Sequence, residues 1–456
     1  MFNEFLDWAR RLFGRPAQEV GAVALAARAE ADYRRVDAVN FTYIFANRLA
    51  NLAVADASLN ASGGGARARA VAGALEDVFQ RAHKLTAQAL GSGGRVLLPY
   101  LCGGQVRFEA VAQDRFFITG TDGGRVTSAA VLAGRAEVDR RVYYRWTDYA
   151  LENGVQRVRS RVTDAGGRAV EMGVVPQWAG LPGEVAIAGV EKLTLAFLRC
   201  PVDNRRERDG YGVPITYGCE ALMDEIHEHM RLIAREYRLT RPMLGLSAEM
   251  WRQPFEGGES GVERARRTVQ DGDDPFIPIE GAYDETKAPW LVYAPAIRNE
   301  AMYDRLEHLF AMLEKAVGTS RGILTARETA AATATEIRAA NHDTLTLVTA
   351  IRRMWEQALD DMAYAADVLC EHYGLTPAGA RGEYAVQVDW DMSLFESGAE
   401  TFEQLCQLHD RNLLSGAELR QWVRGGALEE AQDAIDKIAT EREAISGADA
   451  KEKGGG

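Results

Sequence analysis

The sequence has few cysteines, no long apolar run and no excess of basic residues. Its five cysteines never form a CxxC pair: Cys102, Cys200, Cys219, Cys370 and Cys406. This scatter argues against a disulfide framework or a structural zinc site and predicts reduced thiols. No run approaches the roughly 18 apolar residues that a membrane-spanning helix needs.

The net charge of −13 over 456 residues limits the range of functions. A protein that grips nucleic acid tightly needs a clear Lys/Arg excess for its phosphate contacts, so this class is disfavoured. Loose or transient handling of DNA remains open. The first residues carry acids within an apolar pattern, which is not typical of a secretory signal.

Motifs for nucleotides and cofactors are also missing. No G-x-x-x-x-G-K-[ST] occurs, so the sequence predicts no P-loop. Gly91-Ser92-Gly93-Gly94 is not a dinucleotide fingerprint, because Val96 takes the third glycine position and strands are expected to follow. No cofactor is predicted.

One catalytic motif is formally present. Gly318-Thr319-Ser320-Arg321-Gly322 matches the G-x-S-x-G nucleophile elbow. That elbow needs a strand before the serine, whereas an amphipathic helix is predicted here. The sequence therefore favours a helix C-cap at Gly318 followed by a loop, with a hydrolase using Ser320 as an alternative of a different class.

The histidines do not form a metal-ligand pattern. His227 and His229 lie two apart on a predicted helix, so their side chains point to different sides and do not easily converge on one ion. Solvated histidines on a helix face are the favoured interpretation, and no metal is predicted.

Periodicity divides the chain into helical and β-rich parts. Residues 1–90 show helical patterns, and short apolar runs from 91 to about 200 predict strands, the last of them Leu193–Leu198. Gly103-Gly104, Asp122-Gly123-Gly124 and Asn153-Gly154 are typical of the turns between such strands. The predicted fold class is α+β.

A small insert between two amphipathic helices follows. Helices are expected at 215–238 and 297–317, and residues 241–296 hold three short strand patterns: Met243–Leu246, Pro275–Ile279 and Trp290–Tyr293. Arg264, Arg266 and Arg267 lie among acids in this insert and form either an ordinary helix face or a partner-docking surface. Two helices flanking an insert would act as its stalk.

The C-terminal third is dominated by one long helical pattern. Apolar residues recur mostly at three- and four-residue steps from Ile337 to Leu369, and Gly374 stands where the helix should stop. The segment 318–332 before it is rich in Thr, Ala, Gly and Arg and is expected to be an exposed or mobile loop. A strand at Tyr384–Trp390 and short helices follow, one of them begun by a capping box at Ser415–Glu418.

Several of these segments together resemble the portal proteins of tailed bacteriophages, in the branch common in phages of Gram-positive hosts. The resemblance rests on a combination of motifs that follow the family's order along nearly the whole chain. They are Asp114-Arg115-Phe116-Phe117, Asp209-Gly210-Tyr211-Gly212-Val213-Pro214-Ile215, Gly318-Thr319-Ser320, Thr333-Ala334-Thr335-Glu336-Ile337, Trp355-Glu356-Gln357-Ala358-Leu359 and Asp410–Ser415 through Lys437-Ile438.

The resemblance implies a portal fold with named parts. Residues 1–205 would be the β-rich wing, 206–240 and 297–317 the two stem helices, and 241–296 a small α/β clip. Residues 318–332 would be the tunnel loop, 333–375 the long wing helix, and 376–456 a helical crown with a disordered tail.

The resemblance also implies a function without catalysis. The chain would form a ring, usually of twelve subunits, at one capsid vertex, through which double-stranded DNA is packaged and ejected. Ser320, Arg321, Thr325 and Arg327 would line the channel, and Arg264, Arg266 and Arg267 would help the clip to dock its partners. Those partners would be the terminase large subunit and a head–tail adaptor, with capsid or scaffold proteins elsewhere. The protein would be located in the virion, and in the host cytoplasm during assembly. A capsid or scaffold component without a DNA channel is a second alternative.

Overall fold

The computed structural model describes residues 17–63, 65–205, 210–240, 243–247, 276–279, 290–293, 299–326, 334–377, 381–382, 384–390, 405–411, 413–424 and 431–438. The chain divides into two compact units. The larger comprises Met1–Ala55, Leu59–Ala330 and Ala340–Gln387, and the smaller Asp56–Ser58, Ala331–Ala339 and Val388–Gly456. The elements mix helices with mainly antiparallel sheets, which confirms the α+β class.

The larger unit begins with four helices. They are α2 (Ala17–Tyr33), α3 (Phe41–Val54), α4 (Ala66–Phe79) and α5 (Ala82–Ser92). Asn40 joins the first two, because its side-chain oxygen accepts from the Tyr43 amide at 3.0 Å while its amide donates to the carbonyls of Asp32 and Tyr33. It therefore caps α3 and ends α2 at once.

The helical pattern predicted for residues 1–90, with a break only at 62–65, is wrong at β1 (Ser58–Ser62). This strand pairs with β14 (Ala385–Asp389), within the strand predicted at Tyr384–Trp390. Ser-Leu-Asn-Ala-Ser has little strand propensity of its own. The partner lies more than three hundred positions away, so local periodicity could not reveal it.

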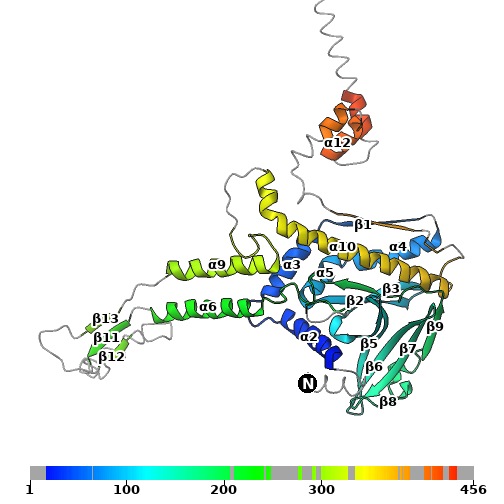
Figure 1. Cartoon of the computed structure of the whole chain (residues 1–456), viewed down its shortest axis with the longest axis horizontal. Coiled ribbons are helices and arrows are strands. Elements are labelled where there is room, and N and C mark those ends of the chain that lie inside the picture. The colour runs from blue at the N-terminus through cyan, green and yellow to red at the C-terminus, as the bar shows by residue number, and fades with distance from the viewer. Residues whose placement is uncertain are drawn as a thin grey trace, which may run out of the picture. The chain divides into compact units, whose positions relative to one another are not determined.

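Two antiparallel sheets follow the helices (Figure 1). The three-stranded sheet has the order β10 (Ala196–Arg199), β2 (Gly94–Cys102), β3 (Gln105–Ala112). The second sheet contains β4 (Phe116–Asp122), β5 (Arg125–Val138), β6 (Arg141–Glu152), β7 (Val155–Asp164) and β8 (Ala169–Val170), with β9 (Glu184–Ala188) also on β7. Three short 3₁₀ helices accompany them: η1 (Gln113–Arg115), η2 (Met172–Val174) and η3 (Pro176–Trp178).

The hairpin turns follow the glycine pattern. Gly103-Gly104, Gly123-Gly124 and Asn153-Gly154 all have positive φ at both positions, as a two-residue turn with the correct twist requires. These predicted turns are confirmed. The β5–β6 turn achieves the same conformation with Asp139 and Arg140, at φ of 51° and 59°, and no glycine marks it.

The long helix α10 runs from Ala334 to His372, about 58 Å at 1.5 Å per residue. It ends as predicted at Gly374, whose φ is 57° and whose neighbour Leu375 donates its amide to the Cys370 carbonyl. Its predicted apolar face is buried from Val348 onward. Buried residues of the predicted face are Val348, Ile351, Trp355, Leu359, Met362 and Leu369, and other buried residues of the same helix include Ala358, Ala366, Val368 and Cys370.

Polar groups hold α10 to the N-terminal helices. Trp355 is fully buried, and its Nε1 donates to the hydroxyl of Thr86 in α5 at 2.7 Å. Arg352 donates to the Ala53 carbonyl at the end of α3 at 3.2 Å. Arg67 of α4 pairs with Asp367 at 2.8 Å, and both side chains are almost entirely buried. The α10 face is thus fixed in register as well as packed.

The motif Gly210–Ile215 joins the sheets to the stalk. The phenol of Tyr211 accepts from the Ile118 amide and donates to the Phe116 carbonyl. Gly212 exchanges two 2.9 Å hydrogen bonds with the Gln113 side chain. A Cβ on Gly212 would lie 2.0 Å from the Gly93 carbonyl oxygen, so only glycine fits.

The stalk consists of α6 (Glu220–Leu239) and α9 (Asn299–Val317). Beyond it lies a three-stranded sheet of β11 (Met243–Ser247), β12 (Phe276–Ile279) and β13 (Trp290–Tyr293). β11 is the central strand, parallel to β12 and antiparallel to β13. The three strands predicted for the insert are confirmed.

The smaller unit contains helical residues 405–410 and 431–438 and helix α12 (Gly416–Arg424). The predicted capping box is confirmed. The Ser415 hydroxyl accepts from the Glu418 amide at 3.2 Å, while the Glu418 carboxylate accepts from the Ser415 amide at 2.8 Å. Two amides that a helix start leaves unpaired are thereby satisfied. The predicted tail at 451–456 lies outside the described residues.

Replacing Gly212 with Ala should lower the free energy of unfolding by about 1–3 kcal/mol, because the new Cβ overlaps the Gly93 backbone. The matched control is Gly73→Ala in α4, where a Cβ meets nothing within 4 Å. That variant should raise stability by about 0.4–1 kcal/mol. Urea denaturation followed by circular dichroism measures both, and equal midpoints would contradict this account of the motif.

Candidate functional site

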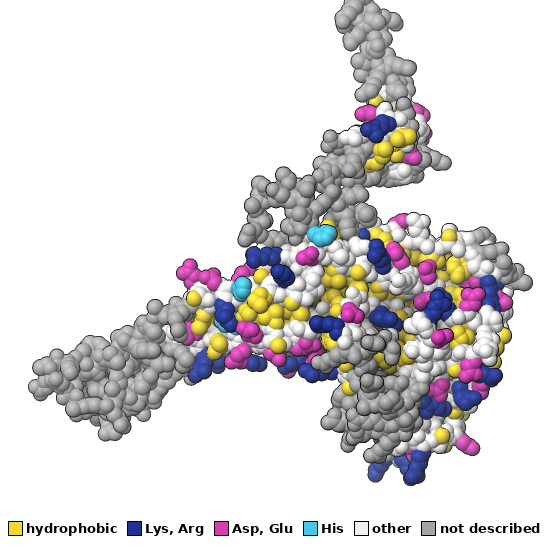
Figure 2. Space-filling view, in the orientation of Figure 1, with side chains coloured by type: hydrophobic (Ala, Val, Ile, Leu, Met, Phe, Trp, Pro, Cys, Tyr) yellow, Lys and Arg dark blue, Asp and Glu magenta, His cyan; other side chains and the backbone are white. Residues whose placement is uncertain are grey.

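The candidate site begins on the stalk, where α6 and α9 lie side by side (Figure 1). Ile226, Ile233, Leu309 and Leu313 are buried, as their stripes predict. Large apolar side chains nevertheless remain exposed on the stalk: Leu232, Tyr237, Tyr303 and Met312. Figure 2 shows apolar side chains gathered over this part of the surface, flanked by charged ones.

Polar contacts set the alignment of the two helices. Arg305 of α9 pairs with Glu225 of α6 at 2.7 Å. Tyr237 and Tyr303 share a hydrogen bond of 3.4 Å between their phenols, which raises the pKa of Tyr237. These contacts fix how far α9 is displaced along α6.

The histidines on α6 bind backbone carbonyls. His229 is buried, with Nε2 2.8 Å from the Met302 carbonyl of α9, and His227 Nε2 lies 2.9 Å from the Val39 carbonyl before α3. The expectation of solvated histidines is therefore wrong for His229. Within the part of the chain that the structure describes, no group of three or more His, Cys, Asp or Glu side chains could hold a metal ion.

The stalk ends at Gly318, as predicted. Its φ is 86°, its amide donates to the Lys315 carbonyl, and the Thr319 amide donates to the Glu314 carbonyl at 2.9 Å. These two hydrogen bonds together form a Schellman C-cap. A helix thus precedes Ser320 where a nucleophile elbow needs a strand, so the local geometry does not support the hydrolase alternative.

The segment that follows, Gly318–Ala326, is here called the connecting segment. Its chain wraps around the carboxylate of Glu314, a residue of α9 that is only 1% exposed. One carboxylate oxygen, Oε1, accepts four backbone amides in succession, from Gly322, Ile323, Leu324 and Thr325, at 3.1, 2.7, 2.6 and 3.2 Å. The other oxygen, Oε2, accepts from the Thr325 hydroxyl at 2.7 Å. Successive amides around one anion form a backbone nest.

A second attachment joins the connecting segment to α10. The Ser320 amide donates to the Thr344 hydroxyl at 2.8 Å, and the Thr344 amide lies 3.5 Å from the Ser320 hydroxyl. The expectation of an exposed or mobile loop is wrong for Thr319 and Thr325, which are 3% and 7% exposed. The reason is that the segment, which has few apolar side chains, is held by hydrogen bonds to the Glu314 side chain of the preceding helix.

The residues that the resemblance assigns to the channel lining differ in their exposure. Ser320 is half-buried and Arg321 is exposed. Thr325 is buried, and its hydroxyl is used within the chain. Arg327, and the clip residues Arg264, Arg266 and Arg267, lie outside the described residues.

Sequence reasoning missed Glu314 and Thr344. Glu314 carried a signal, because an acid in the last turn of a helix opposes the helix dipole and needs another reason to be there. Its position next to Leu313 on the edge of the apolar stripe also predicts partial burial. Thr344 carried no signal, since its partner is 24 positions away.

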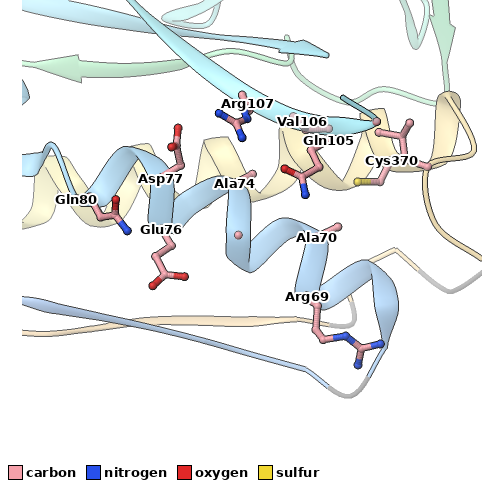
Figure 3. A pocket seen from close by; sticks show the side chains of 13 residues that line it. Arg69, Ala70, Ala74, Glu76, Asp77, Gln80, Gln105, Val106, Arg107 and Cys370 are labelled. Carbon is pink, nitrogen blue, oxygen red and sulfur yellow. The ribbon is translucent and has the colours of Figure 1, made fainter. Parts of the chain in front are cut away.

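A surface pocket lies elsewhere, between α4 and the start of β3 (Figure 3). Its volume is about 340 Å³, and its charged lining has both signs, from Arg69, Glu76, Asp77 and Arg107. This balance selects no ligand class, and no sequence-predicted site residue lies in it. No helix among the described residues is long and apolar enough to cross a membrane.

One protein-family model matches the C-terminal part of the chain. Residues 267–448 match the model of the phage portal protein family, SPP1 Gp6-like. Over this range the chain is similar to phage portal proteins. The matched range contains α9, the connecting segment, α10 and the described helices of the smaller unit. The portal resemblance inferred from the motifs is confirmed over these residues.

One similar solved structure is a chain of the virion of a native gene transfer agent (GTA) particle. It shares 13% identity with this chain, covers 89% of it and 92% of its own length, and has a TM-score of 0.42. No curated protein matches the chain. The similarity to portal proteins therefore rests on the family match over residues 267–448.

Replacing Thr344 with Val should destabilise the protein by about 0.5–1.5 kcal/mol, because the Ser320 amide loses its acceptor. The control is Thr346→Val on the same helix, where the hydroxyl is exposed and donates to the His342 carbonyl at 3.0 Å. It should cost less. Denaturation midpoints of the two variants give the comparison; a larger loss for the Thr346 variant would refute the attachment.

Proposed function

We propose that this chain is a portal subunit that assembles into a ring at one capsid vertex and conducts double-stranded DNA. The family match over residues 267–448 carries the proposal. It is supported by a stalk of two helices, an ordered segment at its end and a long helix after it, in the order that the motifs imply.

Each part then receives a position in the ring. The stalk helices would be the stem, and the sheet β11–β13 would belong to the clip, where a terminase large subunit and later a head–tail adaptor dock. The two antiparallel sheets that contain β2 to β10 would form the wing together with α10. The helices near the C-terminus would form the crown. The exposed stalk residues Leu232, Tyr237, Tyr303 and Met312 offer apolar surface to neighbouring subunits.

The charge of the chain suits a channel that lets DNA slide. A strongly basic wall would hold DNA through many phosphate contacts, whereas the net charge here is −13. Arg321 is exposed on the connecting segment and would place a few positive charges around the ring. Ser320 and Arg327 would accompany it, while Thr325 serves to hold the segment in place.

The protein would not be an enzyme. The work of packaging would come from a separate terminase ATPase, since the sequence has no P-loop. A capsid or scaffold component without a channel is the competing function, and it differs from the portal in a property that can be imaged directly.

Negative-stain electron microscopy of the purified full-length chain should show rings with a central hole. Mass photometry of the same sample should give a mass near twelve times that of the 50.0 kDa chain. Monomers, flat sheets or closed shells would contradict the portal proposal and favour the capsid or scaffold alternative.

Replacing both Arg321 and Arg327 with Ala should reduce the DNA packaged or retained per particle, because the wall becomes more negative next to the phosphates. Quantification of DNA in purified particles measures the effect. The control is Arg353→Ala, an exposed arginine on α10 outside the connecting segment. Unchanged DNA content in the double variant would overturn the role given to these arginines.

A further inference from the structure

The burial of Glu314 needs an explanation that the helix itself does not give. A carboxylate removed from water is costly unless hydrogen bonds replace its hydration. In the last turn of α9, the helix dipole also opposes a negative charge. Helix formation therefore does not favour a glutamate at this position. Its five hydrogen bonds to the connecting segment stabilise the buried carboxylate instead.

The connecting segment depends on Glu314 as much as Glu314 depends on the segment. The four amides of Gly322 to Thr325 occupy no helix or sheet, so each needs an acceptor from elsewhere. Glu314 Oε1 supplies it for all four. Without this oxygen, the amides of Ile323, Leu324 and Thr325 would lose this acceptor together, and the Gly322 amide would keep only the Thr325 hydroxyl, 3.2 Å away. The path of the backbone in the connecting segment thus depends on one carboxylate.

Arg321 lies between the two points of attachment. The Ser320 amide before it is held by Thr344 of α10, and the Gly322 amide after it is held by Glu314. The backbone on both sides of Arg321 is therefore fixed. The exposed Arg321 side chain therefore extends from a backbone position that is fixed at the end of the stalk.

We propose that Glu314 is a positioning residue that latches the connecting segment to the end of the stalk and so determines where Arg321 stands. This inference rests on the proposed portal function for its consequence, which is that the latch sets the position of the positive charges along the DNA path. The latch itself is a property of the chain and can be tested separately.

Limited digestion of the full-length chain with trypsin tests the latch. Cleavage after Arg321 requires the connecting segment to open locally, so its rate reports the population of the open form. Glu314→Ala should speed this cleavage by at least about tenfold, because several amides in half-buried or buried positions lose this acceptor at once. Glu307→Ala, at an exposed position of the same helix, is the matched control and should leave the rate unchanged.

An internal reference is cleavage after Arg140 or Arg141 at the β5–β6 turn, which should proceed equally in all variants. If Glu314→Ala does not fold, Glu314→Gln and Thr325→Val replace it. The first removes the charge, and the second removes the Thr325 hydroxyl with its bonds to Glu314 and to the Gly322 amide, while both keep the shape of the side chain. Each should speed cleavage after Arg321 severalfold. Rates within twofold of the unmodified protein in both of these variants would overturn the latch.

Particles assembled with Glu314→Gln test the consequence. If the latch positions Arg321 along the DNA path, these particles should retain less DNA, whereas Glu307→Gln particles should not. Faster cleavage with unchanged DNA content would overturn the link between the latch and DNA. If the unmodified chain forms no rings, the portal proposal fails while the trypsin result still decides the latch.

Discussion

A long helix can be held along one face only if the polar groups on that face find partners in the core. In α10 this constraint is met by residues far away in the sequence. Trp355 reaches the Thr86 hydroxyl, Arg352 reaches the Ala53 carbonyl, and Asp367 pairs with Arg67. A buried charge without its partner costs several kcal/mol, so the helix can adopt only one register on α3 to α5. The position of α10 in turn determines where the end of the stalk lies, because the Ser320 amide donates to the Thr344 hydroxyl on α10.

The elements that could be predicted are those whose cause is local. The length of α10, the stop at Gly374, the paired-glycine turns and the capping box at Ser415 all depend on residues within a few positions of each other. The stalk helices were predicted from their stripes, although Tyr237 at the end of one stripe is 39% exposed. Periodicity reports which face a helix prefers to bury, and it does not report what is available to cover that face.

The features that could not be predicted have distant partners. β1 forms because it pairs with β14, and His229 can be buried because the Met302 carbonyl accepts a hydrogen bond from its ring. The connecting segment is ordered because the Glu314 carboxylate accepts its amides. Composition alone describes this segment as unable to build a core, which is correct for its own side chains. The backbone amides, which composition does not reveal, supply the interaction instead. The sequence therefore indicated where the connecting segment lies but not how it is held.

The contact between Trp355 and Thr86 has a consequence for synthesis. The two residues are 269 positions apart, so at about 5–20 residues per second Thr86 leaves the ribosome roughly 10–50 s before Trp355 does. During that interval the N-terminal helices lack the apolar cover that α10 provides, and Phe79 lacks the ring against which it packs. The nascent chain thus passes through a stage in which a large apolar surface is open to other chains. Slow translation or a chaperone that binds this surface would then govern how much chain reaches the native fold.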